Sequence, residues 1–249
     1  GSVNHSEGWW QVWFDSYRQF TLSYAKLAQQ TDTERLILGG KAVLPSFSGG
    51  LYPDGSESDV PEMNEDFWFD LLEDLRQVYD GDLIWATNAH QDMDPLPEFI
   101  YEFDSIYLII ESPLATDEEV TLDSLTADFT NVMDSLVYEV HRSTFKPILV
   151  ALSYPSVKGA SQGCALIGEN CYNDGLFSSS EIANYPINLG EQALIYNAVM
   201  PVIASREWIT GISVRGYEPT LLLQDGTSSI AGKPAQDVIQ YWFSGLIAE

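Results

Sequence analysis

The sequence has few positive charges. It carries 11 Lys and Arg against 37 Asp and Glu, a formal net charge of -26 over 249 residues. Nucleic-acid binding depends on a basic face that contacts phosphates, and cations spread from Arg18 to Lys233 do not build one. We therefore expect no nucleic-acid partner. The excess of carboxylate suits an exported protein, or one that works at high salt, because the charge keeps it hydrated.

Long apolar runs are also missing. No stretch of the sequence approaches the roughly 18 apolar residues that a membrane-spanning helix needs. The shortage of cations also disfavours docking on anionic lipid. We therefore expect no membrane insertion. With 45% hydrophobic and 12% aromatic residues the chain nevertheless has enough material for a packed core, which excludes a disordered protein.

Cysteine is scarce, and the two that are present lie close together. Cys164 and Cys171 have no neighbouring His, so they make a poor zinc site. A disulfide that closes a local loop is the better interpretation. Disulfides persist outside the cytosol, so the pair predicts an extracellular or cell-surface protein. The acidic stretches at 54–59 and 92–94 do not match calcium-loop spacing, and we expect no metal or other cofactor.

Helical and strand patterns alternate along the chain. Apolar and aromatic residues recur at helical spacing over 9–29, 63–79, 117–143, 189–205 and 235–247. Five apolar runs, beginning near 36, 82, 104, 147 and 209, are typical of strands, and one helical turn is expected near 97–101. Near-continuous apolar strands that alternate with helices indicate a parallel sheet covered on both faces. The fold class is therefore α/β.

The pattern favours a (β/α)8 TIM-barrel-like fold over a doubly wound sheet. No glycine-rich phosphate loop follows any strand, and the loops after the strands are long and aromatic. A barrel needs eight strands, whereas only five are visible in this sequence. Either the first three βα units lie outside the chain or the barrel is incomplete. We predict a single domain over residues 1–249, without an internal repeat or linker.

Several motifs occur in an order that points to a family. They are Trp10-x-x-Trp13-Phe14-x-Ser16-Tyr17, Leu36-Ile37-Leu38-Gly39-Gly40, Tyr79-x-Gly81-x-Leu83, Phe103-Asp104-Ser105-Ile106, Lys146-Pro147-Ile148-Leu149 with Tyr154-Pro155-Ser156, and Gly232-Lys233-Pro234-Ala235. Together they resemble the third helix and the fourth to eighth strands of clan A glycoside hydrolases, especially the β-mannanase-like branch. The resemblance implies a TIM barrel whose first three βα units precede Gly1. It also implies a polysaccharide or oligosaccharide partner.

The resemblance places two catalytic positions on residues that cannot act in the usual way. The family uses a Glu after strand four as acid/base and a Glu after strand seven as nucleophile, with the two carboxyls about 5 Å apart. The first position reads Gly39-Gly40-Lys41, and the second falls on Ala151 or Leu152. Both glutamates are therefore replaced. Loss of either group removes orders of magnitude of rate, so ordinary retaining hydrolysis is not expected.

Other polar side chains follow the predicted strands, at the ends where barrel enzymes place their sites. The candidate catalytic residues are Glu111 and Asp92, with Glu111 as the acid. Glu111 interrupts an apolar stretch, so an inward-facing side chain would be desolvated and its pKa raised, as a general acid requires. An ion pair with Lys41 or Arg215 explains Glu111 equally well.

The remaining candidates would bind substrate. They are Lys41, His90, Tyr154, Arg215 and Tyr217. Exposed tyrosine rings in loops can stack on a pyranose, which is the reason for choosing Tyr154 and Tyr217. His90 lies in a loop and also fits an anchoring role.

Three functions are consistent with these residues. The first is a glycoside-hydrolase-like protein that binds carbohydrate in a degenerate cleft with weak or no hydrolysis. The second is an active glycosidase whose carboxylates have moved. The third is a structural or scaffold protein, because a fold alone does not fix a function. Sheet edges left without neighbours would also permit self-association.

Overall fold

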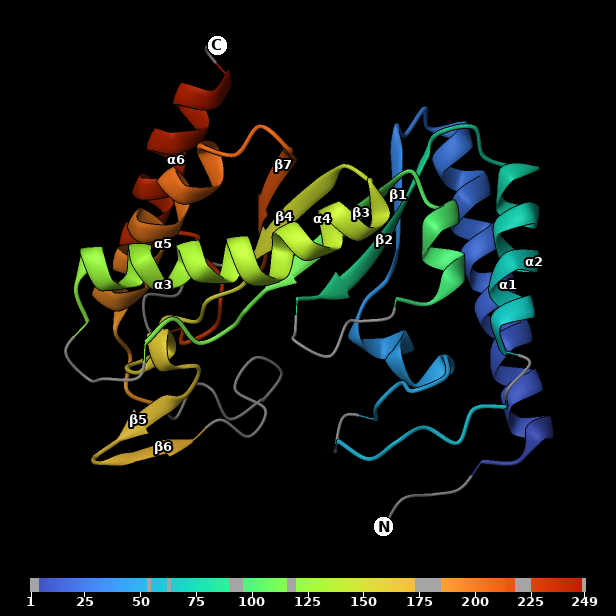
Figure 1. Ribbon diagram of the computed structural model, residues 1–249, viewed down its shortest axis with the longest axis horizontal. Helices are drawn as coiled ribbons and strands as arrows, with labels where there is room; N and C mark the ends of the chain where they lie inside the picture. Colours follow the sequence, from blue (N-terminus) through green and yellow to red (C-terminus); the bar gives the residue numbers. More distant parts are fainter. Residues whose placement is uncertain are drawn as a thin grey trace. The chain divides into compact units, whose positions relative to one another are not determined.

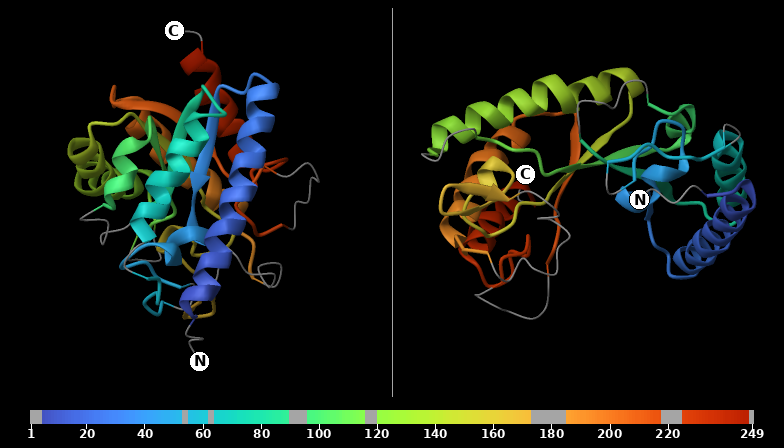
Figure 2. Two further views of the ribbon diagram at one scale, coloured as in Figure 1. Left: turned by 90° about the vertical axis from the view of Figure 1, so that its right-hand side faces the viewer. Right: turned by 90° about the horizontal axis from the view of Figure 1, so that it is seen from below.

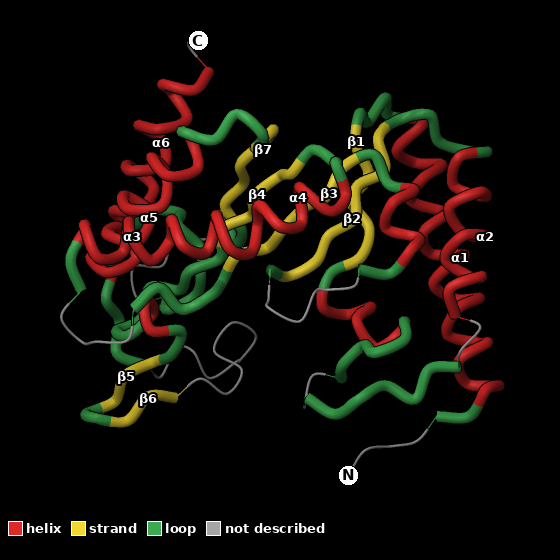
Figure 3. The backbone as a smooth tube through the Cα atoms, in the orientation of Figure 1, coloured by secondary structure: helices red, strands yellow, loops and turns green. Residues whose placement is uncertain are grey.

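A computed structural model describes residues 5–52, 55–61, 64–89, 96–115, 120–172, 185–217 and 225–247. The chain divides into two compact units, residues 1–107 and 108–249. Figure 1 shows the helices and strands, and Figure 3 shows the same backbone coloured by secondary structure.

Five strands form the main sheet, in the order β1-β2-β3-β4-β7. They are β1 (Arg35–Gly39), β2 (Asp82–Asn88), β3 (Ser105–Ile110), β4 (Ile148–Leu152) and β7 (Ile209–Val214). Strands β1 and β2 pair in parallel, and so do β4 and β7. Strands that follow sequence order with helices between them are consecutive βα units. The predicted α/β fold with five βα units is confirmed.

The first unit contains two long helices, α1 (Glu7–Gln30) and α2 (Asn64–Arg76), and two short 3-10 helices, η1 (Lys41–Ser46) and η2 (Glu98–Glu102). Ser6 caps α1, because its side chain accepts a hydrogen bond from the backbone nitrogen of Trp9 at 3.2 Å. Helices α1 and α2 lie side by side (Figure 2). The helical turn expected near 97–101 is η2.

Large aromatic side chains fill the core of this unit. The rings of Trp68 and Phe99 stack with centroids 5.0 Å apart, and Trp85 meets both rings edge-on. All three side chains are essentially inaccessible to solvent. Edge-to-face and stacked pairs add to the stability gained by burying this area. The core therefore fixes α2, β2 and η2 against one another.

Asp59 ties the start of α1 to the loop that follows η1. Its carboxylate accepts hydrogen bonds from the backbone nitrogen of His5, from the Tyr52 hydroxyl at 2.5 Å and from Trp10 Nε1 at 3.1 Å. Burial would raise the pKa of Asp59, but the hydrogen bonds from Tyr52, His5 and Trp10 favour the ionised form and hold its pKa well below the ordinary value. The carboxylate is thus an ionic anchor for this end of the unit.

The second unit contains a continuous helical stretch from Leu122 to Thr144, divided into α3 (Leu122–Val132), a π-helical segment η3 (Met133–Val137) and α4 (Tyr138–Thr144). It also contains α5 (Leu189–Ala204) and α6 (Pro234–Ile247). Helix α5 packs against both α3 and α6. Most of its residues are buried, in keeping with a helix that is apolar nearly all round.

A small hairpin follows β4 and a short helical turn, η4 (Ala160–Gln162). Strands β5 (Ala165–Ile167) and β6 (Asn170–Tyr172) pair antiparallel. Cys164 precedes β5 and forms a disulfide with Cys171 in β6, with Cα atoms 5.5 Å apart. The predicted disulfide is confirmed, whereas the hairpin that it closes was not predicted. Within the described residues, no helix is both long and apolar enough to span a bilayer.

Removing the disulfide should destabilise the protein moderately. Closing so short a loop restricts the unfolded chain by about 2–3 kcal/mol. We expect the Cys164→Ser/Cys171→Ser variant to lose about that much free energy of unfolding in urea titrations. Reductant should lower the stability of the wild type and leave the variant unchanged. Equal stability of the two proteins under oxidising conditions would contradict the prediction.

Asp59 should contribute stability that depends on pH. Its pKa is depressed in the folded protein, so its contribution is complete above the ordinary pKa of about 4 and is lost as pH falls below that value. At pH 7 we expect Asp59→Asn to lower the free energy of unfolding by about 1–2 kcal/mol. Denaturant titrations from pH 7 to pH 2 should show this difference shrinking below pH 4. A difference that stays constant with pH would argue against an ionic anchor.

Candidate functional site

Polar side chains follow the carboxyl ends of β3, β4 and β7 in the second unit. Backbone hydrogen bonds continue past the strands: Ser153 N donates to Ile110 O at 3.1 Å, and Arg215 N donates to Leu152 O at 2.9 Å. The residues directly after the three strands are therefore held side by side. Parallel α/β folds place their binding and catalytic groups at this edge.

Glu111 is the first residue after β3 and is half-buried. In the described segments that follow these three strands, residues 111–115, 153–163 and 215–217, it is the only carboxylate. Burial raises the pKa of the Tyr154 phenol well above its ordinary value, and the proximity of Tyr196 and the negative charge of Glu111 raise it further. Glu111 and Tyr154, both predicted as site residues, are thus electrostatic neighbours.

Tyr154 does not present an exposed ring. Its side chain is fully buried, its hydroxyl donates to Ser112 O at 3.3 Å, and its ring meets that of Tyr196 edge-on. The prediction that Tyr154 forms an exposed platform for sugar is therefore wrong. Residues 153–157, directly after β4, are all buried. The sequence does not reveal this, because a tyrosine in a loop can be buried or exposed. In the structure, Tyr154 braces the residues after β3.

Arg215 and Tyr217 follow β7, and both are exposed. The Tyr217 side chain has 63% of its surface accessible. An exposed phenol ring offers an apolar face and a hydroxyl for hydrogen bonding, and a guanidinium offers five hydrogen-bond donors. The expected exposure of Tyr217 is confirmed, and its contact with sugar stays a prediction.

Lys41 lies in the first unit, directly after two glycines that end β1. Gly39 and Gly40 have φ angles of 94° and 91°, a region that residues with a side chain rarely adopt. Gly40 N donates to Ala86 O at 2.7 Å, and a Cβ on Gly39 would lie only 2.6 Å from the same oxygen. The two glycines allow β1 to end close against β2. Lys41 then starts η1 with an exposed side chain.

Two predicted site residues lie outside the described part of the chain. They are His90 and Asp92, in the segment that follows β2. The structure therefore assigns no position to either side chain, and their roles stay predictions.

Sequence reasoning missed a role for Glu191 in the second unit. Its carboxylate is almost fully buried at the start of α5. It accepts hydrogen bonds from the backbone nitrogens of Gly159 and Ser161, both at 3.0 Å, from Ser161 Oγ at 2.7 Å and from Asn188 Nδ2 at 3.0 Å. Glu191 thus fixes the loop that follows β4. The Asn188-x-x-Glu191 spacing signals a helix start, but not this long-range contact.

A buried cation holds the neighbouring segment 225–233. Lys233 has 3% of its surface exposed, and its Nζ donates to Ser156 Oγ at 2.9 Å and to Thr227 O at 3.1 Å. Burial would raise the pKa of Asp225, but hydrogen bonds from Thr227 and the charge of Lys233 lower it below its ordinary value. The only sequence signal for this contact was the Gly232-Lys233-Pro234-Ala235 resemblance.

The described residues hold no group of three or more His, Cys, Asp and Glu side chains placed to bind a metal ion. At the edge of the second unit the described residues include one carboxylate, one guanidinium and one exposed phenol, from Glu111, Arg215 and Tyr217. These groups can hydrogen-bond and stack on a polyhydroxylated ligand.

Solved structures that resemble this chain are glycoside hydrolases. A GH113 β-1,4-mannanase has 22% sequence identity and a TM-score of 0.66, over 94% of this chain and 63% of its own. A second β-1,4-mannanase of GH113, solved as a complex, has 21% identity and a TM-score of 0.68, over 98% and 67%. The GH113 β-mannanase AaManA from Alicyclobacillus acidocaldarius, in complex with ManMIm, has 20% identity and a TM-score of 0.64, over 98% and 66%. No curated protein matches the chain.

These similarities show the fold, and the chain spans only about two thirds of the length of these mannanases. The family assignment rests on a separate match. The model of Glycoside Hydrolase Family 113 matches residues 2–229, which is most of the sequence. This chain therefore belongs to Glycoside Hydrolase Family 113.

Proposed function

We propose that this protein binds a polysaccharide or oligosaccharide at the carboxyl ends of its strands and hydrolyses it weakly or not at all. Membership of Glycoside Hydrolase Family 113 supports a carbohydrate ligand. The similar solved structures of this family are β-1,4-mannanases, which makes a β-linked mannan the first ligand to test.

The observation that carries this proposal is the set of residues at the ends of β1 and β4. Strand β1 ends at Gly39, and Lys41 follows where the resemblance places the acid/base. Strand β4 ends with Ala151 and Leu152, at the position of the nucleophile, and both side chains are fully buried. An ammonium group and an alkyl group can neither attack an anomeric carbon nor act as the usual carboxylic acid. In this proposal the chain keeps the fold of the family but lacks the two catalytic carboxyl groups.

Binding would use the polar and aromatic side chains that follow β3 and β7 in the second unit. Tyr217 has the exposed ring needed for stacking on a pyranose, and Arg215 has donors for sugar hydroxyls. Glu111 accepts hydrogen bonds from hydroxyls in its ionised form. In this proposal the same edge of the sheet serves for recognition without bond cleavage.

The disulfide and the acidic composition support a location outside the cytosol. Cys164 and Cys171 form a bond that is maintained in oxidising compartments. The net charge of -26 favours a hydrated, well-dispersed protein. We therefore propose that the protein works outside the cell or at its surface, where glycans are accessible.

A second candidate function is hydrolysis with relocated carboxylates. Glu111 favours it, because it is a half-buried carboxylate at the carboxyl end of β3, beside the buried phenol of Tyr154. A carboxyl group at this end of a strand could protonate the oxygen of a leaving group. The second carboxylate that this mechanism needs would be Asp92, as the sequence predicts.

Substitution of Tyr217 should show whether glycan affinity depends on this ring in particular or on exposed tyrosines in general. We expect Tyr217→Ala to weaken binding of manno-oligosaccharide about tenfold, or roughly 1.4 kcal/mol, in isothermal titration calorimetry. Tyr241→Ala is the matched control, because Tyr241 is also exposed, at 75%, but lies on α6. Binding unaffected by Tyr217→Ala would remove this residue from the proposed site. Saturable binding to a protein and to none of a panel of glycans would favour a scaffold instead.

Product analysis should separate binding from hydrolysis. We expect no released oligosaccharide, by mass spectrometry, after long incubation with β-mannans, β-glucans, xylans and α-glucans at low and high salt. Glu111→Gln, which keeps a hydrogen-bond acceptor but removes the acid, is run in parallel. Product that forms with the wild type and disappears with Glu111→Gln would overturn the proposal in favour of relocated catalysis.

A further inference from the structure

Aromatic side chains gather at the amino ends of β4 and β7, at the opposite end of these strands from the candidate site. Trp208 directly precedes β7 and stacks on His141 of α4, with ring centroids 5.3 Å apart. The ring of Tyr138, also on α4, has its centroid 5.6 Å from that of Trp208. Trp208 and His141 are half-buried, whereas Tyr138 is 42% exposed. The three rings therefore form one cluster that presents Tyr138 to solvent.

Phe145 follows the last residue of α4, and its side chain is 85% exposed, more than any other large apolar side chain that the structure describes. Its φ angle of 55° lies in the left-handed region, where glycine or asparagine usually ends a helix. His141 holds this turn, because its carbonyl oxygen accepts from Phe145 N at 2.8 Å and its Nδ1 donates to Lys146 O at 3.0 Å. Neither burial nor backbone conformation favours phenylalanine here, so the ring serves neither the core nor the turn.

The exposed rings of Tyr138 and Phe145 belong to one surface. They are seven residues apart, which places them on the same side of α4 and of the turn that ends it. Ile148 of β4 pairs in register with Ile209 of β7. Because Phe145 lies three residues before Ile148, and Trp208 one residue before Ile209, this pairing brings the two aromatic segments together. The amino-end patch consists of Tyr138, His141, Phe145 and Trp208.

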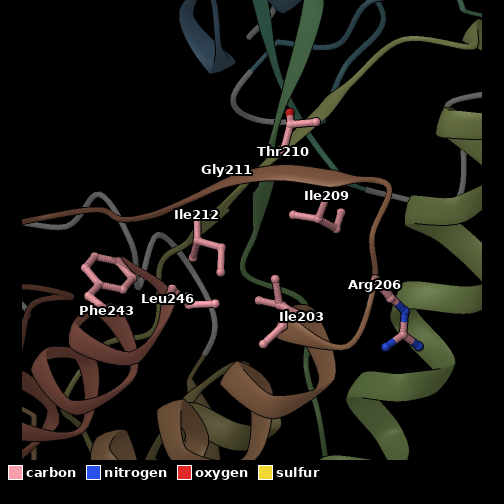
Figure 4. A pocket seen from close by; sticks show the side chains of 9 residues that line it. Ile203, Arg206, Ile209, Thr210, Gly211, Ile212, Phe243 and Leu246 are labelled. Atoms are coloured by element: carbon pink, nitrogen blue, oxygen red, sulfur yellow. The ribbon is translucent and has the colours of Figure 1, made fainter. Parts of the chain in front are cut away.

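Cations and carboxylates are equal in number around the amino-end patch. In residues 134–146 and 206–208 the cations are Arg142, Lys146 and Arg206, and the carboxylates are Asp134, Glu139 and Glu207. Arg206 pairs with Asp134 at 2.5 Å, and Figure 4 shows its side chain directed toward the helical stretch of residues 122–144. A second ion pair joins Arg142 to Glu139 at 2.5 Å. The whole chain carries a net charge of -26, so this part of its surface stands out as neutral.

We propose that the amino-end patch is a second carbohydrate-binding site, which takes a neutral polysaccharide chain. The ligand class rests on the proposed function, whereas the site is separate from the one proposed there. The rings of Tyr138 and Phe145 stack on pyranose faces, and the Arg142–Glu139 pair next to Tyr138 offers donors and acceptors to sugar hydroxyls. Two sites at opposite ends of the same strands bind a long polysaccharide more tightly than a short oligosaccharide, because both sites are occupied at once.

The charge of the protein selects among the possible occupants of the amino-end patch. A second copy of the chain would bring a further net charge of -26, and an anionic polysaccharide would meet the same repulsion. A cationic partner would be attracted to the acidic remainder of the surface rather than to a neutral patch. A neutral polysaccharide meets no repulsion and uses the exposed rings.

Phe145→Gly tests the amino-end patch without loss of the fold. Glycine suits the left-handed turn, so we expect a Tm within about 3 °C of the wild type. Binding to insoluble β-1,4-mannan, measured by depletion of protein from solution, should weaken about tenfold, which is the effect of losing roughly 1.4 kcal/mol. Phe145→Tyr keeps a ring and should bind like the wild type. Tyr241→Ala, which removes an exposed ring from α6, is the matched control and should also bind normally.

Tyr217→Ala distinguishes the amino-end patch from the site at the carboxyl ends of the strands. We expect Tyr217→Ala to retain part of the mannan binding and to lose it when Phe145→Gly is added. Complete loss of binding in Tyr217→Ala alone would overturn the second site and leave the proposed function in place. Binding that Phe145→Gly weakens and Tyr217→Ala does not would support the second site and count against the first.

Three further results would overturn the second site. Phe145→Gly may bind insoluble mannan as tightly as the wild type does, which would leave the ring without a role in binding. A wild-type protein that binds no glycan would overturn this site together with the proposed function. A wild type that is dimeric by light scattering, and that Phe145→Gly makes monomeric, would assign the amino-end patch to a second copy of the chain.

Discussion

The register of the parallel strands decides which side chains meet at the candidate site. Three backbone hydrogen bonds extend the pairing beyond the strand ends: Gly40 N to Ala86 O, Ser153 N to Ile110 O, and Arg215 N to Leu152 O. Because each bond fixes the residue after a strand, the sequence position of a side chain determines its place at the edge. Gly40, Ser153 and Arg215 are the residues placed in this way, at the ends of β1, β4 and β7.

In the proposed function, the identity of a few side chains at the strand ends decides whether a glycan is only bound or also cleaved. A retaining glycosidase needs two carboxyl groups at a fixed separation. One protonates the leaving oxygen, and the other attacks the anomeric carbon. The described strand ends of the second unit offer Glu111 together with Arg215 and Tyr217, groups that bind hydroxyls and ring faces. A family scaffold can therefore keep its ligand class while its chemistry changes, since fold and function are separable.

Periodicity was sufficient to predict the elements that bury a regular face. The α1, α2, α5 and α6 helices and all five strands of the main sheet lie where apolar spacing placed them. The β5–β6 hairpin was not predicted, because each of its strands has only three residues, which is too few to show a periodic pattern. The π-helical turn at Met133–Val137 was not predicted, because its apolar pattern is the same as that of the helix around it.

The site was harder to predict, because it depends on contacts between distant residues. Tyr154 follows a strand, as a site residue should, but the turn of the chain buries it. Glu191 and Lys233 carry the contacts that position the loops after β4, and each reaches partners 30 or more residues away. Hydrogen bonds between residues so far apart in the sequence produce no local sequence pattern. The two glycines before Lys41 were visible in the sequence, whereas their close approach to Ala86 required the paired strand.

The hydrogen bonds of Glu191 have a consequence for affinity. Because this buried carboxylate holds Gly159 and Ser161 in place, the loop after β4 loses its conformational freedom when the protein folds, rather than when a ligand arrives. Ordering a loop on association typically subtracts from affinity. A glycan that contacts this loop would therefore meet a rigid surface and bind with a smaller loss of entropy.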